Sequence, residues 1–463
     1  MNATDTGGTH TGAHVGTDLP GPRSAALLAD QQARESSART YPRRSPLAIS
    51  AGAGSYLFDL DGNRFLDFLC GSGVLALGHN HPDLADAARA QLDVSTQMLD
   101  FPTEVKQEFT SLLFGLLPAE MSDYRIHFCG PTGADGVDAA VKLCKTFTGR
   151  ADVVAFHGGF HGSTQSTLAL SGLRAGMGHL RNLSPGVAFF PYSYCFRCPL
   201  ELHPSDCDIN CVQYLDNVLA DPNGGIVTPA AIVVELVQGE GGVIPARPEF
   251  VRRLRALASR HQIPLVIDEV QSGCGRTGTW FAFEHYGVVP DVVVASKALG
   301  GGHPAAVIIY DRRMDVWAAG AHTGTFRGTQ LAFAAGGAFM RHVTEHDLLG
   351  HVRRVGARLQ EGLRDMAGQY PFLADVRGLG LMLGIEMAAA GTWPASRVAA
   401  ELQSSALHRG LLFEVVGRGD TVARFLPPLN LSPSEADEGL SILAAALADV
   451  DRRSRLDEAA DAS

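Results

Sequence analysis

Short, nearly continuous apolar runs recur between residues 124 and 304, and each ends in a polar residue or a glycine-rich loop. The runs are RIHFC, ADVVAF, AAIVVELV, PLVIDEV and DVVVAS, and stretches with helical patterns separate them. Strands that are apolar along their whole length are typical of a mostly parallel sheet that helices cover on both faces. Open sheets of this kind bind ligands at the carboxyl ends of their strands. We therefore expect an α/β fold with its functional site along that edge.

The length and the changes of pattern along the chain predict more than one domain. At about 150 residues per domain, 463 residues correspond to two or three domains. Residues 1–40 are rich in small polar residues without periodicity, which predicts a disordered N-terminal arm. We expect residues 41–100 to form the N-terminal segment of a small domain, residues 101–334 a large domain, and residues 335–463 the α+β remainder of the small domain.

Three local patterns predict individual elements outside the large sheet. The sequence DGN at 61–63 lies between alternating apolar and polar residues, which is a hairpin signal. The HP pair at 81–82 opens a helix that we expect to end near Leu99. The periodic stretch over 336–363 predicts one further helix, which two strand-like segments, VRGLGLMLGIEM and ARFLPPL, follow.

Charge and hydropathy exclude several classes of partner. Lys plus Arg (38) against Asp plus Glu (49) gives a net charge of −11, so nucleic acid and anionic membranes are not expected as partners. No apolar stretch approaches the roughly 18 residues of a membrane span. The N-terminus has neither the basic start nor the apolar core of a secretory signal. Eight cysteines in a chain of this length do not form a disulfide scaffold, so we expect a reducing, cytoplasmic location.

Lys297 lies just after the apolar run DVVVAS and directly before ALGGG. Burial at the end of such a strand lowers the pKa of a lysine, because the charged ammonium loses its hydration. A neutral amine can then form a Schiff base with a carbonyl group. A surface lysine at a strand exit would have the same sequence pattern, so Lys297 alone does not decide the function.

Asp268 ends the apolar run that precedes DVVVAS, so both side chains can meet at one edge of the sheet. A carboxylate that faces a pyridinium nitrogen keeps that nitrogen protonated and makes the ring an electron sink. A helix N-cap is the alternative role for Asp268. We reject it because Lys297 and two glycine-rich loops accompany Asp268.

The two glycine-rich loops follow other strands of the series. GPTGA at 130–134 joins a strand to a helix, where backbone N–H groups and the Thr132 hydroxyl make an anion site suited to a phosphate. GGFHG at 158–162 carries Phe160, whose ring can stack on a planar ligand. Each loop is a weak signal by itself, and a core phenylalanine beside a flexible loop explains Phe160 equally well.

Taken together, the motifs resemble those of one enzyme family. DGNRFLDFLCGSGVLALGHNHP, GPTGAD, GGFHGST, VVELVQGEGG, VIDEVQSGCGRTG, SKALGGG and GTFRGTQLA are similar, in this order, to the motifs of the class III (ω-) aminotransferases. The resemblance covers about residues 45–450. It implies a pyridoxal 5′-phosphate (PLP) enzyme of fold type I, in which a large domain holds a mostly parallel seven-stranded sheet between helices and a smaller domain is α+β.

The resemblance also implies roles for single residues. Lys297 would be the Schiff-base lysine and Asp268 the partner of the pyridinium nitrogen, so these two are the expected catalytic residues. The remaining residues expected to bind the cofactor are Thr132, Gly133, Ala134, Phe160, His161, Val270, Gln271 and Thr325. Thr325 would contact the cofactor phosphate of a neighbouring subunit, which implies a homodimer with shared active sites.

In this family a Glu of the QGEGG motif pairs with an Arg ahead of a late proline-rich segment, and the matching residues here are Glu240 and Arg424. The resemblance implies that the pair is a gate for substrates. Arg424 would bind the α-carboxylate of glutamate and return to Glu240 when a substrate lacks a carboxylate there. An ordinary structural ion pair is the alternative. Glu235 is expected to support the surroundings of Asp268.

Four motifs, HFCGPTGAD, YSYCFRCPL, GTFRGTQLA and FAFEHYGVVPDVVVASKALGG, are most similar to the diaminobutyrate–2-oxoglutarate aminotransferases within the family. Ser163 stands where 4-aminobutyrate aminotransferases have an Arg, so one carboxylate anchor is missing. Val74 stands where close relatives often have a Thr, and this stretch is expected to border the substrate pocket. The implied partners are amino acids and oxo acids: a diamino acid, 2,4-diaminobutyrate, and the pair glutamate and 2-oxoglutarate.

Two alternatives stay open at this point. One is another class III PLP enzyme, either an aminotransferase for a different ω-amine or an epimerase or aminomutase. The other is a scaffold protein that keeps the fold without the chemistry, although such a chain is expected to have lost Lys297, Asp268 or the phosphate loop.

Four cysteines lie close together in the sequence, at 195, 198, 207 and 211. Four thiols at short spacing can form a tetrahedral zinc site. The two pairs are closer together than in the usual zinc ribbons, and the expected fold needs no metal. We therefore predict no metal and interpret Cys195, Cys198, Cys207 and Cys211 as free thiols, with zinc binding as the alternative.

Overall fold

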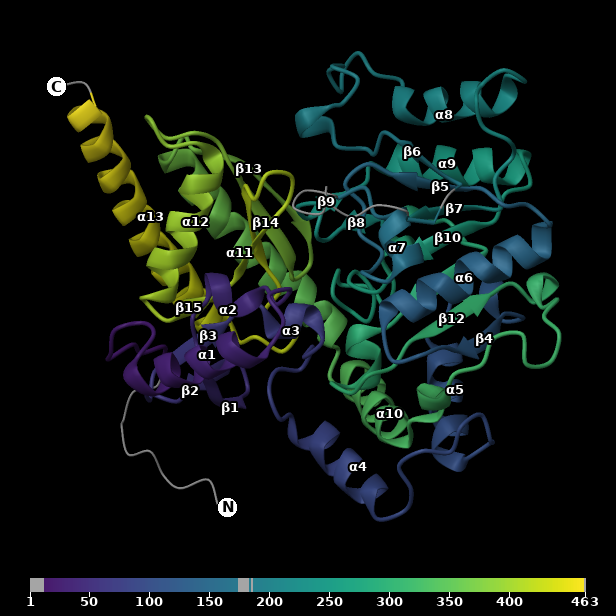
Figure 1. The fold of residues 1–463 in the computed structure, drawn as a ribbon, viewed down its shortest axis with the longest axis horizontal. Coiled ribbons are helices and arrows are strands. Elements are labelled where there is room, and N and C mark those ends of the chain that lie inside the picture. Colours follow the sequence, from purple (N-terminus) through teal and green to yellow (C-terminus); the bar gives the residue numbers. More distant parts are fainter. Residues whose placement is uncertain (1–11, 174–182, 185, 462–463) are drawn as a thin grey trace.

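The apolar strands form one seven-stranded sheet in the computed structural model, which describes residues 12–173, 183–184 and 186–461 (Figure 1). Strand β12 runs antiparallel to both of its neighbours, and the other neighbouring pairs are parallel. The predicted mostly parallel sheet is therefore confirmed. In spatial order the strands are β4 (Arg125–Phe128), β12 (Val307–Tyr310), β11 (Val292–Ala295), β10 (Leu265–Asp268), β7 (Ala231–Val234), β5 (Val153–Phe156) and β6 (Val187–Phe190).

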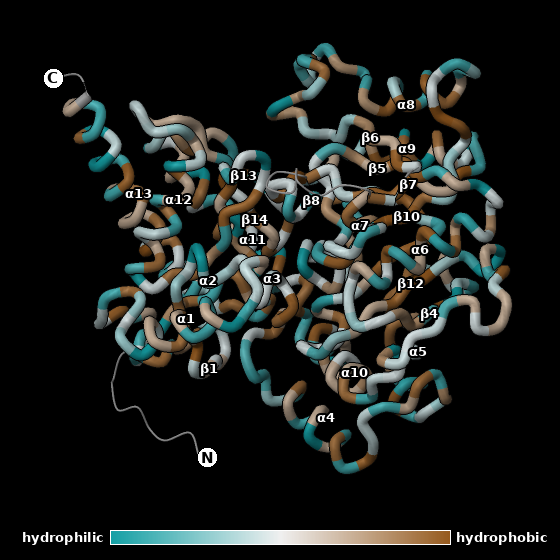
Figure 2. Tube along the Cα trace, viewed as in Figure 1, coloured by the Kyte–Doolittle hydropathy of each residue, from teal (hydrophilic) through white to brown (hydrophobic). Residues whose placement is uncertain are grey.

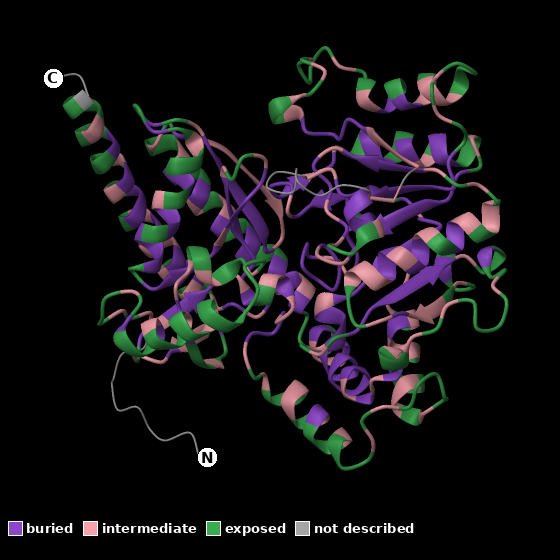
Figure 3. Cartoon of the chain, viewed as in Figure 1, coloured by how far each residue is buried: buried purple, intermediate pink, exposed green. Residues whose placement is uncertain are grey.

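Helices cover both faces of this sheet, because successive side chains of each strand point to opposite sides. Helix α6 (Gly133–Thr148) shares one core with Val233, Val266 and Val294. Helix α9 (Pro248–Arg260) shares the other core with Val234, Ile267 and Val293. Figure 2 shows these strands as apolar and Figure 3 shows them as buried. The other helices of this domain are α5 (Glu104–Gly115), α7 (Gln165–Leu170), α8 (Asn210–Ala220) and α10 (Gln330–Glu345).

A second, smaller group of elements lies to the left in Figure 1 and is built on an antiparallel sheet. Helices α11 (Leu348–Gln369) and α12 (Ala395–Leu407) lie against this sheet, and α13 (Pro433–Asp461) lies against both helices. Among the described residues, no helix is long and apolar enough to cross a membrane. In spatial order the strands are β13 (Leu373–Leu379), β14 (Met382–Met387), β17 (Val422–Phe425) and β16 (Glu414–Val416).

The N-terminal part of the chain joins this smaller group through a third sheet. Its strands are β1 (Ile49–Ala53), β2 (Tyr56–Asp59), β3 (Arg64–Asp67) and β15 (Leu411–Leu412), and β15 runs parallel to β3. The turn at 61–63 connects β2 to β3, so the predicted hairpin is confirmed. The short helices α2 (Tyr41–Arg44) and α3 (Cys70–Gly73) flank this sheet in the sequence.

The prediction of a disordered arm over residues 1–40 is wrong for the part that the structure describes; residues 1–11 lie outside it. Helix α1 (Pro22–Arg34) occupies much of this segment. The Asp61 carboxylate accepts hydrogen bonds from the backbone N–H groups of Arg23 and Ser24, both at 2.8 Å. A carboxylate at a helix N-terminus stabilises the helix. This partner lies far away in the sequence, so local composition did not reveal it.

Helix α4 (Pro82–Leu92) begins where the sequence predicts it but ends before Leu99. The residues that follow pair instead with the loop before α10. Gln97 forms an isolated bridge with Thr329, and the Met98 N–H donates to the Gly328 carbonyl at 3.2 Å. Contacts between distant segments thus outweigh the local helical pattern.

The single helix predicted over 336–363 is in fact two helices, α10 and α11. Asp347 separates them with a φ of 47°, in the left-handed region that a helix cannot continue through. The break lets α10 pack against α4 and α5 while α11 packs against β13 and β14. The change of direction therefore takes the chain from the large sheet to the smaller one.

Candidate active site

Lys297 and Asp268 lie at the carboxyl ends of neighbouring parallel strands. Asp268 ends β10 and pairs in register with Val294 of β11, and Lys297 follows β11 as the first residue of the 3-10 helix η4 (Lys297–Gly300). Both residues line one cavity of about 480 Å³. Every predicted cofactor residue except Thr325 lines this cavity. Its other lining residues are Thr132, Gly133, Ala134, Phe160, His161, Gly162, Ser163, Thr164, Glu235, Glu240, Val270 and Gln271.

Lys297 is mostly buried and has charged neighbours of both signs. Burial lowers its pKa to about 8, although Glu240 and Asp268 act in the opposite direction. Its φ of 49° lies in the left-handed region, which is strained for a residue with a side chain and is often found at functional sites. A fraction of the amine is therefore neutral near neutral pH, as a Schiff-base lysine requires.

An imidazole fixes the position of the Asp268 carboxylate. Oδ2 of Asp268 lies 2.8 Å from Nδ1 of His161, and Oδ1 accepts a hydrogen bond from the Val270 N–H at 3.0 Å. Burial lowers the pKa of His161, but the hydrogen bond and the charge of Asp268 outweigh burial and raise it overall. His161 thus contacts the carboxylate that the sequence assigns to the cofactor ring.

Glu235 follows β7 and holds two loops of the cavity. Its Oε2 accepts a hydrogen bond from the Phe160 N–H at 2.9 Å, and its Oε1 accepts one from the Gly239 N–H at 3.0 Å. Burial raises the pKa of Glu235 to about 7, and Asp268 acts in the same direction. Glu235 therefore positions the Phe160 loop relative to the loop that carries Glu240.

The start of helix α6 has the features of a phosphate site. Thr132 is its N-cap: its backbone N–H donates to Asp135 Oδ2 at 2.9 Å, and its Oγ1 accepts from the Asp135 N–H at 3.4 Å. A Cβ added to Gly133 would lie only 2.7 Å from Cγ1 of Val270, so a side chain would not fit there. The first N–H groups of a helix and its dipole favour an anion at this position.

Arg424 is enclosed by acceptors on the far side of Glu240. Its side chain on β17 is 0% exposed. Nη1 donates to Glu240 Oε1 at 2.6 Å and to Gln271 Oε1 at 3.1 Å, while Nη2 forms an ion pair with Glu414. Glu240 lines the cavity and Arg424 does not, so Glu240 separates the guanidinium from Lys297.

Glu414 is a second carboxylate partner of Arg424, and the sequence interpretation missed it. It lies directly opposite Arg424 in the antiparallel pairing of β16 and β17. Burial and Glu240 raise the pKa of Glu414. Burial also acts to raise the pKa of Glu240, but the charges of Arg424 and Lys297 and the hydrogen bonds to Glu240 together lower it. The signal in the sequence is a lone acidic residue inside the apolar run LLFEVV. Only the strand register identifies its partner.

Besides Arg424, two other predicted residues lie outside the Lys297 cavity of this chain. Val74 lines a neighbouring cavity of about 250 Å³ together with Ala298 and His303. Ser72, two residues earlier, contacts Arg424 directly: its Oγ accepts a hydrogen bond from Arg424 Nη2 at 3.3 Å. Thr325 is exposed at the start of the 3-10 helix η6 (Thr325–Gly328).

The four cysteines at 195, 198, 207 and 211 are free thiols in the structure. No three of their sulfur atoms lie within 4.8 Å of one another. Burial raises the pKa of Cys211 to about 11.

A lysine suited to Schiff-base formation, a carboxylate on the neighbouring strand and a helix start suited to a phosphate define a PLP-dependent enzyme. The sequence matches the family aminotransferase class-III over residues 37–447. The chain belongs to this family and is an aminotransferase.

Relatives align with the chain over nearly its full length. A diaminobutyrate–2-oxoglutarate aminotransferase of Rhizobium meliloti is 44% identical and covers 93% of this chain and 94% of its own length. A protein of the same name from Haemophilus influenzae is 41% identical and covers 89% of this chain and 92% of its own length.

Solved structures of aminotransferases share the fold. An ornithine aminotransferase from Toxoplasma gondii has a TM-score of 0.79 at 25% identity, covering 93% of this chain and 96% of its own. A PLP-bound amine transaminase from an uncultivated Pseudomonas species has a TM-score of 0.80 at 27% identity, covering 90% of this chain and 98% of its own.

The residues of the cavity fit PLP, the cofactor of this enzyme. The start of α6 with the small Gly133 beside Val270 would hold the phosphate, and Asp268 would pair with the ring nitrogen. Lys297, a buried amine with a lowered pKa, would react with the aldehyde group. Phe160 lines the cavity as the aromatic residue expected to stack on the ring.

Proposed function

We propose that the enzyme transfers the terminal amino group of 2,4-diaminobutyrate to 2-oxoglutarate, which yields aspartate semialdehyde and glutamate. The names of the relatives from Rhizobium meliloti and Haemophilus influenzae support these substrates. The observation that carries the proposal is the position of Glu240, which lines the Lys297 cavity and holds Arg424 behind it. Such a pair can present either a carboxylate or a guanidinium to the substrate.

Lys297 and Asp268 perform the proton chemistry. When bound, PLP supplies an electron sink for the carbon that carries the amino group. Lys297 Nζ takes a proton from that carbon as a general base and returns a proton as a general acid. Asp268, held by His161, provides the negative charge for the ring nitrogen. The lowered pKa of Lys297, about 8, suits a group that must act both as base and as acid near neutral pH.

The two amino donors of the reaction differ next to the reacting carbon. The terminal carbon of diaminobutyrate carries only hydrogens, whereas the α-carbon of glutamate carries a carboxylate. With the first donor, Arg424 stays paired with Glu240 at 2.6 Å. With glutamate, Arg424 forms a bidentate pair with the carboxylate. Glu414 stays within reach of Arg424 from β16 and balances its charge in both states.

Ser163 supports a diamino acid over 4-aminobutyrate as the donor. Ser163 lines the cavity and carries no charge, so it cannot replace a cationic anchor for a distal carboxylate. Val74 lies in the adjacent cavity, and its role in substrate choice is part of the proposal.

A homodimer completes the proposed active site. Thr325 is exposed, so its hydroxyl is free to contact the cofactor phosphate of a second subunit. We also propose a cytoplasmic location, which the eight free cysteines support because thiols stay reduced there.

A panel of amino donors with 2-oxoglutarate tests the proposal. Glutamate should form fastest with 2,4-diaminobutyrate and slowly with 4-aminobutyrate. An epimerase or aminomutase would form no glutamate from any donor. A scaffold protein is tested separately by borohydride reduction and peptide mapping: the enzyme should carry the cofactor on Lys297 and not on Lys106, Lys142 or Lys145, which are the other lysines of the chain.

A further inference from the structure

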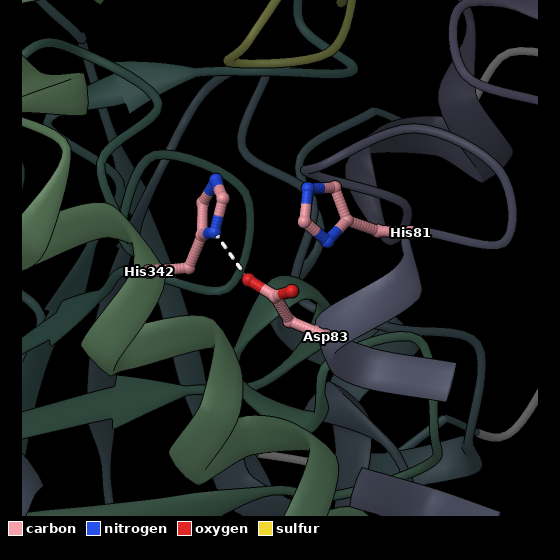
Figure 4. A group of neighbouring side chains, drawn as sticks. All are labelled: His81, Asp83 and His342. Carbon is pink, nitrogen blue, oxygen red and sulfur yellow. Dashed lines mark hydrogen bonds and ion pairs between the residues drawn. The ribbon is translucent and has the colours of Figure 1, made fainter. Parts of the chain in front are cut away.

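Three side chains outside the Lys297 cavity converge between helices α4 and α10. His81 is the N-cap of α4 and Asp83 lies in its first turn, whereas His342 lies in the last turn of α10. Figure 4 shows the three side chains pointing toward one another from these two helices. One potential ligand atom of each residue lies within 4.8 Å of the other two.

The imidazole of His81 carries a buried nitrogen without a partner. Its Nδ1 is shielded from solvent and has no hydrogen-bond partner among the residues that the structure describes. A buried polar atom of this kind is normally satisfied by a neighbouring group, a water molecule or an ion. In Figure 4 the Asp83 carboxylate lies between the two imidazole rings, so the unsatisfied ring belongs to the same cluster.

The contact between Asp83 and His342 leaves Nδ1 of His81, the third side chain of the cluster, without a hydrogen-bond partner among the described residues. Nδ1 of His342 lies 2.6 Å from Oδ2 of Asp83, which is an ordinary hydrogen bond or ion pair. The second imidazole, that of His81, packs edge-on against His342 with 4.4 Å between ring centroids. The neighbouring His346 stacks on the His342 ring with 4.1 Å between ring centroids, and its Nδ1 lies 3.0 Å from the His342 carbonyl oxygen.

We propose that His81, Asp83 and His342 bind one divalent transition-metal ion, such as Zn²⁺, and thereby link the start of α4 to α10. Two imidazole nitrogens and one carboxylate oxygen are a ligand set that Zn²⁺ uses, with the remaining coordination position open. The ion would replace the direct contact between His342 and Asp83, because each residue would then turn its ligand atom to the metal.

The proposed site is separate from the catalytic cavity but lies near the helices that pack around Lys297. None of the three residues lines the Lys297 cavity. His81 lines the neighbouring cavity with Ala298, and α10 packs against both α4 and the η4 helix that begins at Lys297. A metal ion at this position would therefore stabilise the packing around η4 without entering the reaction.

Titration calorimetry of the untagged, PLP-loaded enzyme with ZnCl₂ and CoCl₂ tests the proposal. We expect one ion per chain in the wild type. His342→Gln and Asp83→Asn should each weaken binding by about 100-fold or more, because each removes a ligand. His408→Gln is the matched control, since His408 is exposed at the end of α12, and it should bind like the wild type.

The double variant Cys207→Ser/Cys211→Ser tests whether the metal ion binds at the cysteines instead of at the histidine site. Co²⁺ bound to imidazole and carboxylate gives weak d–d absorption, whereas thiolate ligands add an intense charge-transfer band. We expect only d–d bands, unchanged in the cysteine variant. The proposal is overturned if the wild type binds no ion, if His342→Gln and Asp83→Asn bind like the wild type, or if a charge-transfer band disappears in the cysteine variant. Should His342→Gln fail to fold by circular dichroism, Asp83→Asn decides, because the Asp83 side chain is 52% exposed.

Discussion

Oε1 of Glu240 accepts a hydrogen bond from Nη1 of Arg424 at 2.6 Å, although 184 positions separate the two residues in the chain. Glu240 lies between the short strands β8 (Val237–Gln238) and β9 (Ile244–Pro245) next to the large sheet, and Arg424 lies on β17 of the smaller one. The ion pair therefore joins the two parts of the molecule at the wall of the Lys297 cavity. In the proposed mechanism, substrate choice depends on the same bond that links the two sheets.

Arg424→Gln should slow the half reaction with glutamate far more than the half reaction with diaminobutyrate. Only glutamate places a carboxylate beside the reacting carbon, and losing its bidentate partner costs about 2 kcal/mol or more, which is roughly 30-fold. Single-turnover absorbance of the cofactor measures each half reaction separately. Equal losses in both half reactions would mean that Arg424 has a structural role only.

Glu240→Gln should have the opposite effect. Without the Glu240 charge, Arg424 faces the terminal carbon of diaminobutyrate unneutralised, so this half reaction should slow while the glutamate half reaction is largely retained. Glu414→Gln is the control, since Glu414 also pairs with Arg424 but does not line the cavity. The gate is refuted if the two variants change both half reactions alike.

Asp268→Asn should lower kcat by about 10²–10³-fold, because an amide provides no negative charge for the ring nitrogen. His161 Nδ1 would still contact the side chain at this position, so the fold and PLP content should change little. Steady-state kinetics together with absorbance of the bound cofactor measure both quantities. An unchanged kcat would remove Asp268 from the mechanism.

The rate at which the PLP-free protein takes up PLP should rise with pH and level off above about 8. Lys297 reacts as the neutral amine, and burial lowers its pKa from 10.5 to about 8. Between pH 8 and 10.5 the Lys297 amine is mostly protonated in the unfolded chain and mostly neutral in the folded one. The free energy of unfolding of the PLP-free protein should therefore increase as the pH rises from about 8 toward 10.5. Stopped-flow absorbance at several pH values measures uptake. A rate that keeps rising well beyond pH 8 would indicate an unperturbed lysine.

Sequence patterns predicted the parts of the molecule that depend on the residues within one short segment. The strand runs and the loops after them located Lys297, Asp268 and the start of α6, because each of these follows or ends a short, mainly apolar strand. The resemblance to a family added Arg424 and Glu240, which no local pattern connects.

The parts that sequence reasoning missed depend on contacts between distant segments. Glu414 meets Arg424 only through the register of β16 and β17. Helix α1 is held at its start by Asp61, and α4 ends early because Gln97 pairs with Thr329. In each case a partner far away in the sequence decides the local structure, so composition and periodicity did not identify that partner.

The most direct test of the proposed reaction follows the nitrogen atom. Purified enzyme is supplied with 2-oxoglutarate and diaminobutyrate labelled with heavy nitrogen at either the terminal or the α position, and the glutamate formed is analysed by mass spectrometry. We predict labelled glutamate from the terminal label only, and no glutamate with Lys297→Ala. Label arriving from the α position, or turnover that survives Lys297→Ala, would contradict the account.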